Sequence, residues 1–158
     1  WTPSSDIVNA LTPAEPVTQK AIFGFGDVAG GGVVSVTNLA NSSGTIASDV
    51  SGVGTARNKL AAATYGIDKA IFAYGENSGG SKVSMSNLVS NSGVVSADVT
   101  GVGTARAVLA AASYGGDKAM FAYGQNSGGT RVSLKNSANS LVSKLWSADS
   151  GVTNAIFL

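Results

Sequence analysis

The chain has 158 residues, enough for one modest domain with a hydrophobic core of its own. Ten Lys and Arg side chains stand against nine Asp and Glu, and this formal net charge of +1 gives no basis for binding nucleic acid or a charged membrane surface. There is no cysteine and no histidine, which excludes disulfides, thiolate chemistry, imidazole metal ligands and the Ser-His and Cys-His nucleophile pairs. No apolar run approaches the roughly 20 residues of a membrane-spanning helix, so membrane insertion is not expected.

Residues 1–18 contain all three prolines of the chain. Because proline interrupts both sheet ladders and helix interiors, this segment is predicted to be an extended N-terminal arm. Such an arm either docks on a neighbour or frays, and the sequence leaves both open. The remaining residues, 19–158, form the predicted repeat domain.

An internal repeat begins at Lys20. The segment Lys20–Gly26 recurs as Lys69–Gly75 and again as Lys118–Gly124, with an offset of 49 residues each time. A period near 50 residues is typical of propeller blades and related arrays. The repeat divides the domain into units 19–67 and 68–116 and an atypical terminal unit, 117–158.

Each full unit is predicted to form four short antiparallel strands, starting with the aromatic run that follows the repeated lysine. The second strand alternates apolar and polar side chains, which places one face on a core. The fourth contains Leu-Ala-Ala-Ala, which favours a helix by propensity, but its shortness and its flanking glycines favour a strand. The predicted ranges are Val34–Asn38, Val83–Asn87 and Val132–Asn136 for the second strand, Thr45–Val50 and Val94–Val99 for the third, and Ala56–Thr64 and Ala105–Ser113 for the fourth.

The order of arginine, small apolar strand, Tyr-Gly, apolar strand, double glycine and alternating strand resembles a kelch-like β-propeller blade. The residues that carry the resemblance are Arg57 or Arg106, Tyr65 or Tyr114, the Ile-Phe-Ala-Tyr-Gly strand, and Gly79-Gly80 or Gly128-Gly129. The particular phrase Gly-Val-Gly-Thr-Ala-Arg, with Asn-Ser-Gly turns, is similar to repeats in bacteriophage tail-fibre and virion-surface proteins. This resemblance implies a structural or receptor-facing module in an extracellular, virion setting.

About three units are too few to close a propeller of roughly four to eight blades. The chain is therefore expected to be part of a longer array, to close a ring with other chains, or to stack as an open array whose ends are buried by neighbours. We favour assembly with other copies, as a homo-oligomer or with other virion proteins, because exposed sheet edges promote aggregation.

Several polar residues recur with the repeat. Arg57 and Arg106 are predicted to pair with carboxylates that recur in the same units, either Asp68 and Asp117 or Asp49 and Asp98. A structural role for these residues, and for Tyr65 and Tyr114, is favoured over a site for an acidic sugar, because recurrence in every unit is what an architecture requires.

Residues near the Gly-rich turns are the candidates for ligand or surface contacts: Tyr74, Tyr123, Glu76 and Gln125. Strict alternation places Tyr74 and Tyr123 on the same side of the strand as Phe72 and Phe121, which favours core filling for most of these rings. The position shared by Asp27, Glu76 and Gln125 changes from carboxylate to amide, which argues against a catalytic or metal role. Trp1 and Trp146 lie outside the regular repeats and are candidates for contacts between chains.

Three functional hypotheses follow. The first is a non-enzymatic structural virion component of the tail-fibre or surface type, with no cofactor and no catalytic residue. The second is a carbohydrate-binding or adhesion module that holds a host-surface glycan. The third is a fragment of a propeller enzyme, which the sequence favours least, since the Cys, His and Tyr copper ligands of galactose-oxidase-type propellers are not available.

Overall fold

The computed structural model describes residues 20–139 and 144–148, and within them every regular element is a β-strand in a small antiparallel sheet. This confirms the prediction of an all-β chain. The alanine-rich segments form strands β4 (Ala61–Tyr65) and β9 (Ala110–Tyr114), so the choice of strand over helix is also confirmed. No helix able to cross a membrane occurs among the described residues. The predicted arm, residues 1–18, lies outside them.

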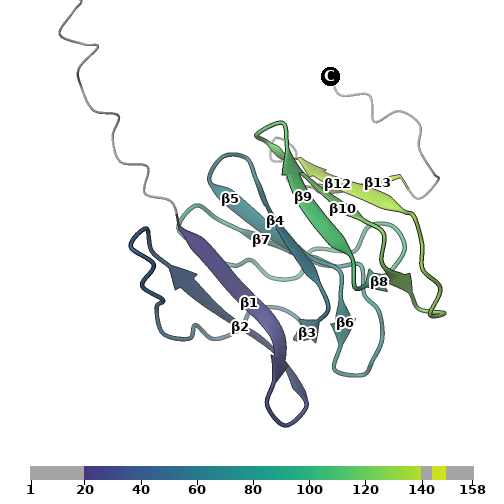
Figure 1. Ribbon diagram of the computed structural model, residues 1–158, viewed down its shortest axis with the longest axis horizontal. Helices are drawn as coiled ribbons and strands as arrows, with labels where there is room; N and C mark the ends of the chain where they lie inside the picture. The colour runs from purple at the N-terminus through teal and green to yellow at the C-terminus, as the bar shows by residue number, and fades with distance from the viewer. Residues whose placement is uncertain (1–19, 140–143, 149–158) are drawn as a thin grey trace, which may run out of the picture.

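Three larger sheets stand side by side in chain order (Figure 1). The first sheet has two strands, the middle sheet three in the order β4-β5-β7, and the last sheet four in the order β13-β12-β10-β9. Their remaining strands are β1 (Ala21–Val28) and β2 (Gly32–Ala40) in the first sheet, β5 (Lys69–Ala73) and β7 (Ser86–Val89) in the middle sheet, and β10 (Lys118–Ala122), β12 (Lys135–Asn139) and β13 (Lys144–Ala148) in the last.

Two very short ladders lie beside the large sheets. Strand β3 (Arg57–Asn58) pairs with β6 (Glu76–Asn77), and β8 (Arg106–Ala107) pairs with β11 (Gln125–Asn126). Each ladder begins with a buried arginine. The ladders therefore fix the position of that arginine relative to the sheet that follows it.

The structure changes the predicted ends of several strands. In the middle unit the second strand is β7, which begins three residues later than the predicted Val83–Asn87. The ladder is interrupted because Tyr74, at the end of β5, has a left-handed φ of 64°, and its N–H donates instead to the carbonyl of Met85. The predicted third strands make only isolated bridges, such as Val89 with Val95.

Strands β4 and β5 form one hairpin, with Ala63 opposite Ile71. The boundary between units 19–67 and 68–116 therefore passes through the turn of this hairpin. The middle sheet combines the last strand of one sequence unit with the first two strands of the next.

Strand β5 is buried on both faces, because a sheet lies on each side of it. Ile71 and Ala73 belong to a core shared with the last sheet, where Ala119 and Phe121 lie. Phe72, on the opposite face of β5, belongs to a separate core with side chains of the first sheet. The hydrophobic interior of the chain thus lies between neighbouring sheets.

The small side chains of β4 and β9 let the middle and last sheets approach closely. Ala63 and Ala111 both pack against the core between these sheets. At the end of the contact, the hydroxyl oxygens of Thr64 and Ser113 are 2.7 Å apart. Alanine at these positions is thus explained by packing between sheets, which overrides its preference for helix.

Candidate functional site

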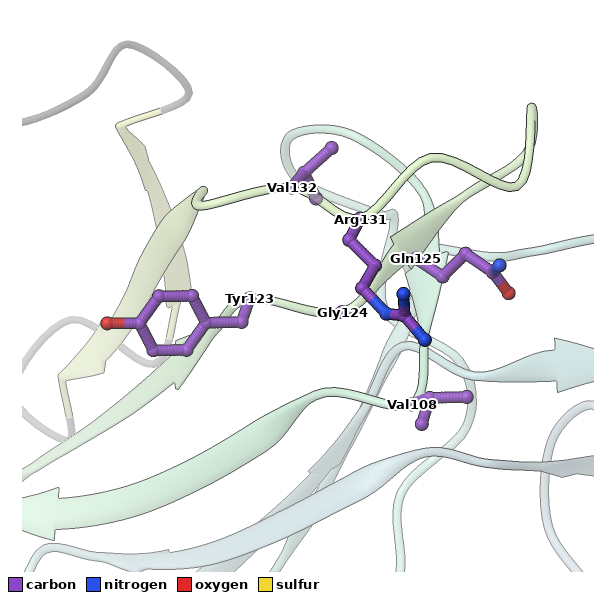
Figure 2. Close-up of a pocket in the computed structure, with 6 residues that line it drawn as sticks. All are labelled: Val108, Tyr123, Gly124, Gln125, Arg131 and Val132. Atoms are coloured by element: carbon purple, nitrogen blue, oxygen red, sulfur yellow. The ribbon is translucent and has the colours of Figure 1, made fainter.

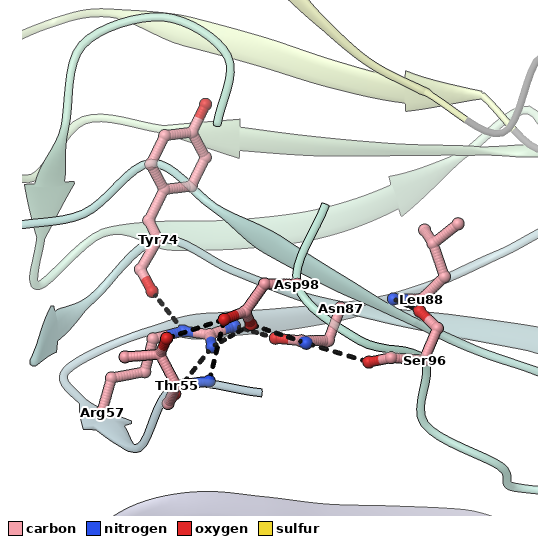
Figure 3. Close-up of polar contacts among 7 residues, drawn as sticks. All are labelled: Thr55, Arg57, Tyr74, Asn87, Leu88, Ser96 and Asp98. Carbon is pink, nitrogen blue, oxygen red and sulfur yellow. Dashed lines mark hydrogen bonds and ion pairs between the residues drawn. The ribbon is translucent and has the colours of Figure 1, made fainter. Parts of the chain in front are cut away.

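The Thr-Ala-Arg phrase places a charged side chain in the interior. Arg57 is fully buried at the start of the β3 ladder. Its Nε donates to the carbonyl of Tyr74 at 2.8 Å, and its Nη1 donates to the carbonyl of Thr55 at 3.1 Å. The Nη2 group donates to the Asn87 side-chain oxygen at 2.6 Å. The guanidinium therefore connects its own segment to the end of β5 at Tyr74 and to Asn87 in β7 (Figure 3).

Asn87 and Asp98 complete this network. The Asn87 amide nitrogen donates to the Ser96 carbonyl at 3.0 Å and to the Asp98 carboxylate at 2.9 Å. Asp98 also accepts hydrogen bonds from the backbone N–H and the hydroxyl of Thr55, at 2.9 and 2.7 Å. Its other oxygen lies 3.7 Å from Arg57 Nη1. Asp98 is thus the carboxylate partner of Arg57, and it lies in the following sequence unit, 68–116, whereas the sequence predicted a partner in the same unit as the arginine.

Burial and charge act in opposite directions on these two groups. Burial lowers the pKa of Arg57 to about 10, although the charge of Asp98 raises it, so the guanidinium remains a cation at neutral pH. Partial burial favours the neutral form of Asp98, but hydrogen bonds from Thr55 and Asn87 and the charge of Arg57 together lower its pKa below the usual value.

Each buried arginine also contacts an aromatic ring of the preceding sheet. The guanidinium carbon of Arg57 lies 4.3 Å from the centre of the Phe25 ring, and that of Arg106 lies 4.1 Å from the centre of the Tyr74 ring. These distances are well within the range of a cation–π contact. We call this pairing of an arginine with the aromatic residue of the preceding sheet the arginine joint.

Arg106 has much the same surroundings as Arg57. It is fully buried, its Nη1 donates to the Thr104 carbonyl at 3.2 Å, and its Nη2 donates to the Asn136 side-chain oxygen at 2.5 Å. Asn136 thus corresponds to Asn87. The arginine, the asparagine and the ring of the preceding sheet recur together.

The position of the ring depends on the left-handed backbone of its residue. Phe25, Tyr74 and Tyr123 have φ values of 63°, 64° and 64°, which are uncommon for bulky side chains. This conformation reverses the expected direction of the ring: Tyr74 packs on Phe121 of the next sheet, whereas Phe72 packs on Phe25 of the previous one. The prediction that Tyr74 lies on the same side as Phe72 is therefore wrong.

Among the described residues, no further sheet follows the one that carries Tyr123. Tyr123 is 55% exposed, whereas Tyr74 is completely buried. Tyr123 borders an open pocket of about 500 Å³ whose other polar side chains are Gln125 and Arg131 (Figure 2). The rest of the lining is apolar or backbone: Val108, Gly124 and Val132.

Glu76 and Gln125, predicted as surface contacts, have different partners. The Glu76 carboxylate lies 2.8 Å from the ammonium of Lys59 and 2.5 Å from that of Lys82, and these hydrogen bonds, with Lys59 foremost, lower its pKa. Gln125 instead donates to the carbonyl of Gly129 at 2.7 Å. Among the described residues, Arg131 forms no ion pair, so the pocket at Tyr123 has a cationic rim.

The other predicted site residues are not brought together. Asp68 is exposed and Asp117 contacts the neighbouring Lys118, so neither carboxylate is the partner of a buried arginine. Tyr65 is buried in the core, where burial raises its pKa, and Tyr114 is half-buried. Trp146 lies in β13 opposite Ser137, and Trp1 lies outside the described residues.

Sequence reasoning missed Arg131 and Val108 as pocket residues. Both positions vary between units, with Lys82 in place of Arg131 and Lys59 in place of Val108. A comparison of the copies could therefore have identified them as candidate binding residues. A second, smaller groove of about 320 Å³ lies at the first sheet and includes Phe23, Lys59 and Phe72. Within the described part of the chain, no three Asp or Glu residues come together as a metal site.

The buried arginine is expected to be irreplaceable by lysine. Lysine keeps the charge in Arg57→Lys but cannot serve the Tyr74 and Thr55 carbonyls and Asn87 at once, so we expect a loss of about 3 kcal/mol of unfolding free energy. Equilibrium urea unfolding measures this. The control Arg131→Lys, at an exposed arginine, should change stability by less than about 0.5 kcal/mol. A similar small effect of Arg57→Lys would contradict the proposed role.

Stability should fall in acid partly through Asp98. Its pKa is lower in the folded chain than in the unfolded one, so its stabilising effect is present above about pH 4 and is lost as the pH falls through the folded value. The variant Asp98→Asn is expected to be less stable at pH 7 and to lose less further stability between about pH 4 and pH 2. Urea unfolding across this range tests it, with Asp68→Asn as the control for the loss of one negative charge. An acid loss as steep as that of the unmodified chain would refute this role.

Comparison with known proteins identifies structures of similar fold but assigns the chain to no family. No protein-family model matches the chain, and no curated protein matches its sequence. Among solved structures, 98 chains match it in fold. The structure of YjhT superposes with a TM-score of 0.65 at 13% sequence identity, and the match covers 80% of this chain and 41% of YjhT. The chain is thus similar in fold to a little under half of YjhT, and at this identity the likeness shows the fold alone.

Proposed function

We propose that the chain is a non-enzymatic structural module of a virion surface or tail fibre, which works extracellularly in an assembly with further copies or other virion proteins. Its sheets are kelch-like blades that recur at intervals of 49 residues. The virion setting is supported by the resemblance of the Gly-Val-Gly-Thr-Ala-Arg phrase to phage repeats. Assembly is supported by one structural observation: both ends of the row of sheets present side chains that are buried elsewhere in the chain.

At the C-terminal end, the outer face of the last sheet corresponds to a face that is covered in the middle sheet. Ile71, Ala73 and Tyr74 of the middle sheet are each 0% exposed because the last sheet packs on them. The equivalent residues Met120 and Ala122 are only partly buried, and Tyr123 is 55% exposed. The last sheet therefore retains a packing face in the absence of a packed neighbour.

The N-terminal end shows the converse. Phe72 of the middle sheet is 3% exposed and faces the first sheet, whereas its counterpart Phe23 is 58% exposed. Ala21, which corresponds to the partly buried Ala70, is also exposed. A repeat array normally ends in polar capping faces, so apolar faces at both ends favour burial against further units.

Two arrangements would bury these faces. Further blades could close a kelch-like propeller, or successive units could stack as an open array. In both arrangements the sheets within the chain keep the same contact, in which an arginine joint connects a sheet to the ring of the sheet before it. The sparse charge and the dense hydrogen bonding of the turns suit a durable scaffold in either arrangement.

A glycan-binding module is the second candidate, and the pocket at Tyr123 is the observation that favours it. The exposed tyrosine ring could stack on a sugar, Gln125 could bond to hydroxyl groups, and Arg131 could bind the carboxylate of an acidic sugar. Tyr74 could not take part, because its ring is completely buried.

The assembly proposal predicts association that depends on the end faces. Sedimentation velocity from about 5 to 500 µM should show mass that increases with concentration, and the double variant Phe23→Ser with Tyr123→Ser should remain monomeric because it removes the large apolar groups from both ends. Val94→Ser changes an exposed apolar residue that lies away from these rings, and it should associate like the unmodified chain. A compact monomer at every concentration would overturn the proposal.

A further inference from the structure

We propose that the pocket at Tyr123 is a docking site for an extended polypeptide segment in which an arginine stands between small residues, supplied from outside these 158 residues. The inference rests on the proposed function, because it takes the C-terminal end as an assembly surface. It adds the chemistry of the partner, namely a Thr-Ala-Arg type of segment that completes an arginine joint on Tyr123.

The middle unit shows how such a segment is bound. Arg106 stacks on the Tyr74 ring, and its backbone carbonyl accepts a hydrogen bond of 3.0 Å from the Gly75 N–H. Two residues later, the N–H of Val108 donates to the Lys59 carbonyl at 2.8 Å. The Tyr74 hydroxyl donates to the carbonyl of Val102 at 3.2 Å. The residues from 102 to 108 are therefore held by the ring and by backbone groups on both sides of it.

The pocket at Tyr123 contains the counterparts of the residues that hold this segment. They stand 49 positions later in the sequence. Tyr123 corresponds to Tyr74 and Gly124 to Gly75. Likewise, Val108 corresponds to Lys59, Gln125 to Glu76, Arg131 to Lys82 and Val132 to Val83. Of these counterparts, Lys59, Tyr74, Gly75 and Val83 contact the Arg106 segment.

The backbone of the pocket also has the conformation that the bound segment requires. Tyr123 and Gly124 have φ values of 64° and 98°, close to the 64° and 111° of Tyr74 and Gly75. The N–H of Val132 donates to the Gly124 carbonyl at 2.9 Å, as that of Val83 does to Gly75. Within the described residues the Gly124 N–H has no backbone acceptor, whereas the Gly75 N–H is bonded to Arg106. The backbone of the docking site thus already has the bound conformation before a segment covers it.

Unlike the rings of the two arginine joints, the Tyr123 ring has no closely stacked cation among the described residues. The nearest described one is the ammonium of Lys135, 6.0 Å from the ring centre, compared with 4.1 and 4.3 Å in the two arginine joints. The residue at the corresponding position of the middle unit is Ser86, which is buried and uncharged. The ring remains 55% exposed, which leaves its face available to a planar guanidinium.

The arginine must come from outside this sequence. The chain has three arginines, of which Arg57 and Arg106 are buried in their own joints and Arg131 lines the pocket itself. A second copy stacked through its first sheet does not supply one, because the position 49 residues before Arg57 is Val8. A different polypeptide segment that carries the phrase is therefore required.

The test is a titration of the ¹⁵N-labelled full chain with a synthetic peptide that has the sequence of residues 100–109, Thr-Gly-Val-Gly-Thr-Ala-Arg-Ala-Val-Leu. We expect saturable chemical-shift changes at Val108, Tyr123, Gly124 and Gln125. A peptide with glutamine in place of the arginine should bind about tenfold more weakly or worse, because the stacked cation is removed.

Protein variants locate the binding. Tyr123→Ala should weaken the peptide about tenfold or more, whereas the matched control Phe23→Ala, which removes an exposed ring from the opposite end, should leave affinity unchanged. Lys135→Ser, which restores the residue of the middle unit and removes a neighbouring positive charge, should bind at least as tightly as the unmodified chain.

Three outcomes would overturn the inference: no saturable shifts at these residues, equal binding of the arginine and glutamine peptides, or shifts produced by glucuronate and not by the peptide. Association of copies without peptide binding would refute the arginine site and leave the proposed assembly intact. Peptide binding by a chain that stays monomeric would support the arginine site and contradict the self-assembly.

Discussion

The sheets of this chain are joined by arginines that are completely removed from water. Unpaired donors on a buried guanidinium are costly, so Arg57 depends on the Tyr74 and Thr55 carbonyls, and on Asn87, at fixed positions. Two of those partners, Tyr74 and Asn87, lie 17 and 30 residues further along the chain. The hydrogen bonds that one buried cation requires therefore fix the β3 ladder relative to the middle sheet and, through Asp98, relative to the loop that follows β7.

The arginine also determines how one sheet meets the next. Its flat face lies on an aromatic ring of the preceding sheet, and that ring can be presented only because its residue takes a left-handed φ just before a glycine. At Gly75 a side chain would have its Cβ 2.6 Å from the Asn58 carbonyl oxygen, so a glycine is required sterically after the aromatic residue. The cores on either side of β5 then form between sheets whose spacing is already set.

Much of the fold could be predicted from the sequence, because its signals are local and repeated. The alternating run Val34–Asn38 correctly predicts a strand, because it lies within β2, and the glycines that flank Leu-Ala-Ala-Ala correctly favour a strand over a helix. The left-handed Tyr74 was not predictable, since bulky residues rarely adopt this conformation and alternation placed its ring on the opposite face. The late start of β7 follows from that break in the ladder.

The candidate site was only partly predictable, for a related reason. The recurrence of Arg57 and Arg106 indicated a structural role, and Asp98 was among the candidate partners, but the contact of each arginine with the preceding ring depends on three-dimensional packing. Tyr74 and Tyr123 stand in the same Phe-Ala-Tyr-Gly sequence with the same left-handed φ, but the last sheet covers Tyr74, whereas Tyr123 is 55% exposed. Position in the array therefore gives one tyrosine a packing role and leaves the other accessible.

The central claim is that the arginine joint makes neighbouring sheets a single cooperative unit. Native-state hydrogen exchange at increasing urea tests it directly, through the amides of Ile71 in the middle sheet and Phe121 in the last sheet. The account predicts that both amides exchange with the same free energy of opening, and that Arg106→Lys allows the last sheet to open at a lower free energy than the middle one. Independent opening of the two sheets in the unmodified chain, or joint opening that Arg106→Lys leaves unaltered, would contradict it.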